Sequence, residues 1–94
     1  MEQKLKYNDK GRSGNIVYCN GKEEINFTYE FGWAESVAII DIPTIINWEE
    51  ETKTKLSSRC LILKFVAEQL IADLAQGCKY GILDNYIYFV KNSN

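Results

Sequence analysis

Histidine is absent from these 94 residues, and proline occurs only once. Without histidine, the chain lacks the commonest general base and the commonest nitrogen ligand for metals. Its three cysteines, Cys19, Cys60 and Cys78, form no CxxC pair, so the sequence predicts neither a disulfide framework nor a zinc knuckle. We therefore expect no metal and no cofactor, and the free thiols favour a reducing, cytoplasmic location.

The chain also lacks a long apolar run, because its longest helical segment is interrupted by Lys64, Glu68 and Asp73. A signal peptide and a membrane span are therefore not expected. With 11 basic and 13 acidic side chains the net charge is -2, so neither a nucleic acid nor a membrane is an expected partner. Residues 23–51 hold eight acidic and no basic side chains, which favours a basic protein surface as partner.

Alternating apolar and polar residues predict β-strands on both sides of a helical region. The predicted strands cover residues 15–19, 25–31, 36–42, 79–83 and 86–91. Asn20 and Gly21 join the first two strands and favour a type I′ turn, whose central positions both need a positive φ. Asp84 and Asn85 join the last two strands, and both residue types tolerate turns.

The region between these hairpins predicts two helices, a short one over 44–52 after Pro43 and a long one over 59–76 that ends at Gly77. The order βββααββ is typical of an α+β fold, in which an antiparallel sheet is covered on one face by the long helix and the short helix is an addition. The predicted organisation is a flexible polar arm over 1–14, a single α+β domain over 15–91 and a tail over 92–94.

The long helix carries two apolar stripes when residues are placed at 100° steps. The stripe expected to face the sheet consists of Cys60, Leu63, Val66, Ala67, Leu70, Ile71 and Leu74, which predicts a buried structural thiol at Cys60. The opposite stripe consists of Leu61, Phe65 and Ala72. Two explanations stay open for this second stripe: it is covered by Trp48 or the N-terminal arm, or it docks a partner protein.

Three consecutive carboxylates, Glu49, Glu50 and Glu51, lie on the short predicted helix. They cannot converge on one metal ion, because consecutive helical residues point 100° apart. They remain candidate contacts to a basic partner. The glycine-rich segment 11–14 lacks the spacing of a phosphate-binding loop, and the strand aromatics do not follow an RNA-recognition arrangement.

The sequence therefore predicts a small non-catalytic cytoplasmic protein-interaction domain, in which an inhibitor, immunity-type or dimerising role fits the size and charge. The predicted partner-binding residues are Leu61, Phe65, Ala72, Glu49, Glu50 and Glu51. One alternative is a small-molecule-binding module with an aromatic-lined pocket between helix and sheet. Another is an enzyme, which would need a pocket that joins Asp41, Asp84 or Cys60 to a second titratable group.

Overall fold

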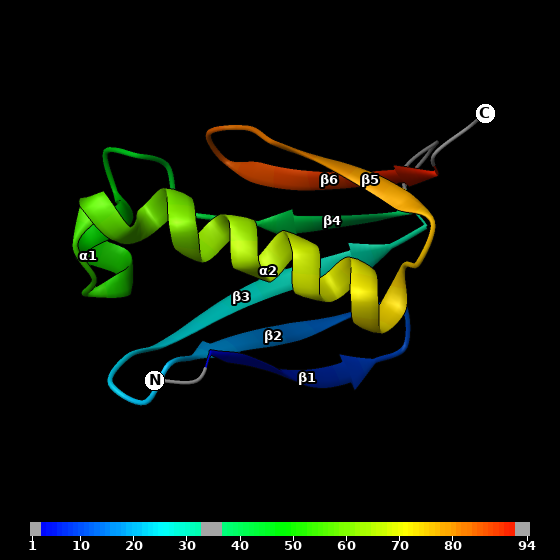
Figure 1. Ribbon diagram of the computed structural model, residues 1–94, viewed down its shortest axis with the longest axis horizontal. Helices are drawn as coiled ribbons and strands as arrows, with labels where there is room; N and C mark the ends of the chain where they lie inside the picture. Colours follow the sequence, from blue (N-terminus) through cyan, green and yellow to red (C-terminus); the bar gives the residue numbers. More distant parts are fainter. Residues whose placement is uncertain (1–2, 33–36, 92–94) are drawn as a thin grey trace.

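A computed structural model describes residues 3–32 and 37–91, without the side chains of residues 9 and 10. The elements are β1 (Lys4–Lys10), β2 (Ser13–Cys19), β3 (Glu24–Phe31), β4 (Ala38–Asp41), α1 (Trp48–Thr52), the 3-10 turn η1 (Leu56–Ser58), α2 (Arg59–Leu74), β5 (Cys78–Ile82) and β6 (Tyr86–Lys91). Figure 1 shows α2 lying across one face of the sheet, with α1 at one end. The predicted α+β fold, an antiparallel sheet covered on one face by one long helix, is confirmed.

The six strands form one sheet in the order β1-β2-β3-β4-β6-β5, and every neighbouring pair is antiparallel. The register aligns the alternating apolar residues of adjacent strands, so that Ile16 lies opposite Phe27, and Ile40 lies opposite both Tyr29 and Ile87. These side chains are buried under α2 together with Trp48. The pairing of β4 with β6 makes the meander and the C-terminal hairpin one continuous sheet.

The prediction of a flexible arm over residues 1–14 was wrong, because residues 4–10 form strand β1 along the edge of β2. Leu5 and Tyr7 alternate with exposed lysines and pack against the core on the same side as α2. Gly14 of β2 allows this approach, since a Cβ at that position would overlap the backbone oxygen of Asn8. The many polar residues around Leu5 and Tyr7 concealed a strand with one apolar face.

The predicted type I′ turn at Asn20 and Gly21 was also wrong. The loop spans residues 20–23, and only Gly21 in it has a positive φ, of 91°. The Asn20 side-chain oxygen accepts hydrogen bonds from the backbone N–H groups of Lys22 at 3.0 Å and Glu23 at 2.8 Å. This side chain therefore satisfies the turn, as asparagine commonly does.

Helix α2 is rotated about its axis compared with the prediction, so that its buried face includes residues nearer to β1. Its buried residues are Ile62, Leu63, Val66, Ala67 and Leu70, whereas the predicted members Cys60 and Leu74 are exposed. Strand β1, which was not predicted, explains this rotation of the helix about its axis. It widens the sheet beneath the side of α2 that carries Ile62 and Phe65. The buried thiol predicted at Cys60 was therefore wrong, and α2 ends at Leu74, before the predicted residue 76.

The short helix α1 begins at Trp48, four residues later than predicted. The N–H of Ile45 is instead bound by the Asp84 carboxylate at 2.9 Å, and the N–H of Asn47 donates to the backbone oxygen of Thr44 at 3.1 Å. Residues 45–47 therefore form a turn ahead of α1.

The hydroxyl of Tyr7 links β1 to α2 by donating a hydrogen bond to Asp73 Oδ2 at 2.7 Å. Burial, followed by this hydrogen bond, raises the pKa of Tyr7 well above its usual value of 10.0. In the unfolded chain the same hydroxyl loses its proton near pH 10. Above that pH the unfolded state binds fewer protons than the folded state, so stability falls as the pH rises.

We expect the free energy of unfolding to decline above about pH 10, and Tyr7→Phe to make that decline shallower. Urea unfolding followed by circular dichroism, from about pH 8 to about pH 11, measures both slopes. Part of the decline should remain, because burial also raises the pKa values of Tyr18 and Tyr80. Equal slopes for wild type and Tyr7→Phe would contradict the assignment.

Candidate interaction surfaces

The predicted second stripe of α2 is only partly free for docking. Leu61 is 73% exposed and Ala72 is exposed, but Phe65 is half-buried and packs edge-on against the Tyr18 ring, with centroids 5.8 Å apart. Trp48, one of the two predicted covers, is fully buried in the core. Phe65 therefore belongs mainly to the fold, and Leu61 is the member of the stripe that faces solvent most strongly.

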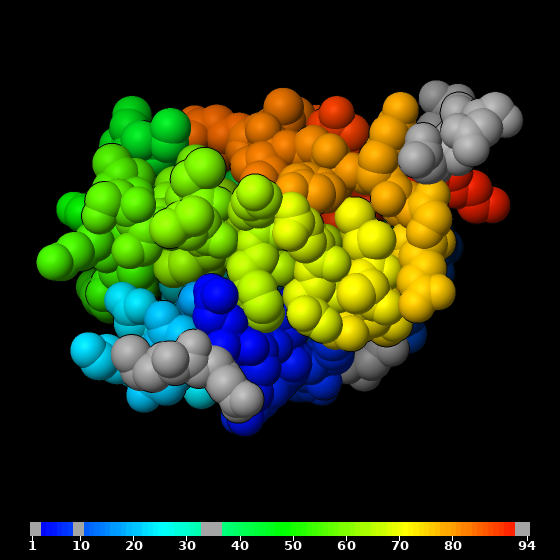
Figure 2. Space-filling view, viewed as in Figure 1, coloured from blue at the N-terminus to red at the C-terminus, as the bar shows by residue number. Residues whose placement is uncertain are grey.

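Segment α1, turn η1, the start of α2 and the β5–β6 turn meet at one end of the molecule (Figures 1 and 2). Leu61 is one of several large aliphatic side chains that are exposed on these segments and on the loop before α1. We call this surface the apolar end, and its members are Ile45, Ile46, Leu56, Leu61 and Leu83. Ile46 is 92% exposed. Among the large apolar side chains that the structure describes as exposed, only Leu74 lies elsewhere.

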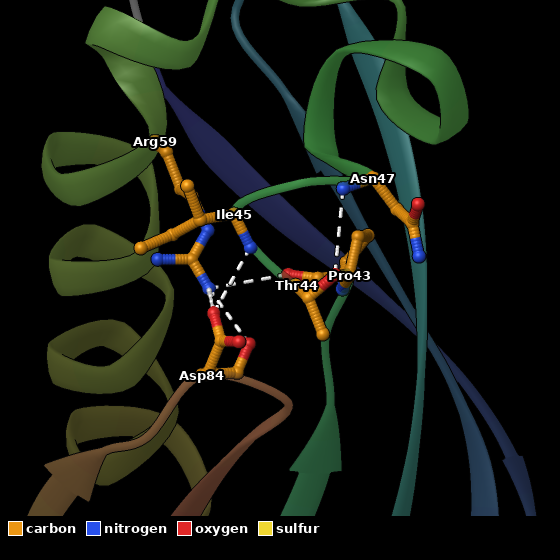
Figure 3. Close-up of polar contacts among 6 residues, drawn as sticks. All are labelled: Pro43, Thr44, Ile45, Asn47, Arg59 and Asp84. Atoms are coloured by element: carbon orange, nitrogen blue, oxygen red, sulfur yellow. Dashed lines mark hydrogen bonds and ion pairs between the residues drawn. The ribbon is translucent and has the colours of Figure 1, made fainter.

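Arg59 holds the segments of the apolar end together (Figure 3). Its Nη2 group donates hydrogen bonds to the backbone oxygens of Pro43 at 3.1 Å and Asp84 at 2.8 Å, and it lies 3.7 Å from Asp84 Oδ1. The same Asp84 oxygen accepts the N–H of Ile45. The Arg59 guanidinium also lies over the Trp48 ring, 5.7 Å from its centroid. The loop before α1, the start of α2 and the β5–β6 turn are thus tied to one side chain.

The carboxylates predicted to contact a partner lie at the rim of the apolar end. Glu49, Glu50 and Glu51 are exposed on α1, and the Glu49 carboxylate also accepts the N–H of Leu56 at 2.8 Å. Lys53 and Lys55 are exposed directly after this helix. The rim therefore carries both signs of charge, although the sequence of residues 23–51 is strongly acidic.

Other acidic residues of that segment lie on the sheet face turned away from α2, here called the open face. Within the described residues, this face carries Glu24, Glu30 and Asp41 from β3 and β4, beside an apolar strip of Ile39, Tyr86, Tyr88 and Val90 from β4 and β6. The strip was missed because its members are brought together only by the pairing of β4 with β6. The available signal was that residues 37–41 and 86–90 are apolar on both strand faces.

A hollow of about 360 Å³ opens on this face, lined by Glu30, Ile39, Asp41 and Tyr86. Asp41 accepts a hydrogen bond from the Thr28 hydroxyl at 3.2 Å, which orients its carboxylate. Nearby, the Tyr88 ring lies against Gly81, where a Cβ would overlap the ring. Gly81 therefore allows Tyr88 to lie close to the sheet and to extend the apolar strip toward β5.

The alternative of an enzyme requires a pocket in which Asp41, Asp84 or Cys60 lies beside a second titratable group. This hollow meets that requirement, because Asp41 lines it together with Glu30 and Tyr86. Both carboxylates are exposed, however, whereas catalytic acids and bases are usually tuned by burial. The other two residues named for that alternative lie apart: Asp84 is bound to Arg59, and Cys60 is exposed on α2. Within residues 3–32 and 37–91, no group of three potential ligands is placed to hold a metal ion.

Side chains fill the space between α2 and the sheet, where the ligand-binding alternative placed its pocket. The aromatic rings of Tyr18, Phe27, Tyr29 and Phe89 are buried there as part of the core. The hollow beside Tyr86 lies on the opposite side of the sheet. The aromatic residues that were expected to line a ligand pocket therefore stabilise the fold.

Comparisons with known proteins add no relative: no protein-family model, curated protein or solved structure matches this chain. In the part of the chain that the structure describes, neither helix has the length and apolar character needed to cross a lipid bilayer. The apolar end and the open face are therefore the two surfaces from which we infer a function.

Proposed function

We propose that this chain is a non-catalytic protein-interaction domain, and that its apolar end docks a second copy of the same chain. The observation that carries this proposal is the set of large aliphatic side chains exposed on the segments that meet at this end of the molecule, with Ile46 92% and Leu61 73% exposed. Large aliphatic side chains that are exposed together on one surface and rimmed by charge typically mark interaction sites. The Arg59 contacts also support docking, because a surface already ordered before binding loses less entropy.

The charges around the apolar end favour a second copy over a strongly basic or acidic partner. Glu49, Glu50 and Glu51 lie close to Lys53 and Lys55, and all five side chains are exposed. In a two-fold dimer the same patch meets itself, so a residue away from the axis faces a different residue of the other copy. A rim of one sign would repel itself, whereas this mixed rim can pair carboxylates with ammonium groups across the axis.

The expected dimer is weak. Burying one leucine or isoleucine side chain contributes about 1.5 to 3 kcal/mol, so Ile46 and Leu61 from both copies contribute about 6 to 12 kcal/mol. The loss of translational and rotational freedom alone costs about 4 to 15 kcal/mol. The most favourable difference between these ranges is about 8 kcal/mol, which corresponds to a dissociation constant of about 1 μM, so we expect dissociation in the micromolar range or above.

Sedimentation equilibrium of the full chain tests this proposal. The wild-type mass should rise with concentration from 10.9 kDa toward twice that value. Ile46→Lys and Leu61→Lys place a charge in the interface, and each should raise the dissociation constant by about tenfold or more. Leu74→Lys is the matched control, since Leu74 is an exposed leucine at the other end of α2 and should leave association unchanged.

Two outcomes would contradict self-association through the apolar end. One is a wild-type chain that stays monomeric at millimolar concentration. The other is equal weakening by Leu61→Lys and Leu74→Lys, which would place the contact elsewhere on the molecule.

A further inference from the structure

We propose that the hollow on the open face binds a lysine or arginine side chain from a segment of a partner protein. The surface is separate from the apolar end, so this inference does not depend on self-association. The hollow joins two carboxylates, of Glu30 and Asp41, to the apolar side chains of Ile39 and Tyr86. A long cationic side chain has these two parts, a charged head and an apolar stem.

The carboxylates are placed to share one cation. Glu30 lies opposite Ile39 in the β3–β4 ladder, and Asp41 lies opposite Thr28 two positions away. Diagonal neighbours of this kind are about 7 to 8 Å apart, so a charged head between them comes within reach of both. A guanidinium group suits this arrangement well, because its several N–H donors diverge in a plane.

The apolar wall of the hollow selects against a metal ion or an anion. Ile39 and Tyr86 offer carbon surface and an aromatic ring, whereas calcium requires six to eight oxygen ligands. A phosphate or carboxylate would be repelled by Glu30 and Asp41. A lysine or arginine stem can pack on Ile39 while its charge interacts with the face of the Tyr86 ring.

Among the side chains that the structure describes, the lysines of the open face lie away from Asp41. Lys4 and Lys6 are on β1 and Lys79 is on β5, and each of these strands is at least two strands away from β4. Two strand spacings are about 10 Å, which equals the screening length at 0.1 M salt. Arg12 is closer to Glu30, because both line a neighbouring hollow. Asp41 is therefore the carboxylate that governs attraction here.

The occupant that fits this surface is a protein segment, larger than a free amine. The apolar strip continues from Ile39 to Tyr88, and Val90 lies further along β6. Tyr88 lies close to the sheet because position 81 is glycine. Residues beside the basic side chain can therefore pack along this strip.

Titration of the full, isotope-labelled chain with short peptides tests this inference by NMR. The probes are three peptides of equal length, which differ only in having arginine, lysine or glutamate at the central position beside a leucine. Free arginine is the fourth probe. We expect saturable shifts at Ile39 and Tyr86 with the arginine and lysine peptides. Asp41→Asn should weaken binding by about fivefold, as for an exposed ion pair. Tyr86→Leu should weaken it by a similar factor of about five.

Glu50→Gln is the matched control, because it removes the same charge from α1 at the other surface and should leave peptide binding unchanged. If Glu50→Gln and Asp41→Asn lower the peptide affinity equally, the net charge of the chain explains the binding, and the proposed site is wrong. Equal affinity for the glutamate peptide, or no shifts at Ile39 and Tyr86, would also contradict the site. Free arginine binding as tightly as the peptide would overturn the assignment to a protein segment. Thermal unfolding of each variant checks that its fold is intact.

Discussion

Replacing Trp48 by alanine is expected to lower the free energy of unfolding by about 3 to 5 kcal/mol. Trp48 is fully buried and is the largest of the completely buried side chains, so its removal leaves a cavity that the short α1 helix cannot readily fill. The substitution also removes the hydrogen bond from Nε1 to the backbone oxygen of Lys55, at 3.2 Å, and the ring beneath Arg59. For so small a domain this is a large fraction of the total stability.

Urea unfolding followed by far-ultraviolet circular dichroism measures this loss without a tryptophan signal. Trp48→Phe is the informative partner variant, because it keeps an aromatic ring but loses the indole donor, and it should cost less than Trp48→Ala. A loss below about 1 kcal/mol for Trp48→Ala would contradict the central packing role of this side chain.

Replacing Gly14 by alanine is expected to destabilise the chain by about 1 to 3 kcal/mol, although glycine to alanine in a strand normally stabilises. The added Cβ would overlap the Asn8 backbone oxygen and would lie 3.1 Å from the Tyr29 hydroxyl. A backbone atom cannot rotate out of the way, so β1 must move away from β2. We expect the loss of protection to concentrate in residues 4–8.

Hydrogen exchange of the β1 amides, together with urea unfolding, measures both parts of this effect. Ser13→Ala is the matched control, because Ser13 is the exposed neighbour in the same strand and should change stability by less than about 0.5 kcal/mol. Unchanged exchange in β1 of Gly14→Ala would show that the strand accepts the extra carbon.

The parts of the fold that could be predicted are those with a strong local pattern. Ile25, Phe27 and Tyr29 alternate with polar residues, and the structure buries all three. Strand β1 has the same alternation at Leu5 and Tyr7, but the pattern is short and surrounded by charge. That strand is stabilised by pairing with β2 and by the Tyr7 contact to Asp73, neither of which is a local property.

The candidate surfaces also differ in whether a local sequence pattern or a tertiary contact brings their residues together. Leu61 was found because helical periodicity places it opposite the core. Ile45 and Leu83 were missed because they are distant in sequence and are brought together by Asp84 and Arg59. The hollow was missed for a similar reason, since Asp41 and Tyr86 become neighbours only when β4 pairs with β6.

The strand order also bears on how the chain folds during synthesis. β6 is translated after β4 and β5, yet it lies between them inside the sheet. Until β6 leaves the ribosome, β4 has one unpaired edge and β5 has no partner. Exposed strand edges invite pairing with other chains. Until β6 is available, the nascent polypeptide therefore presents strand edges that are open to misassembly.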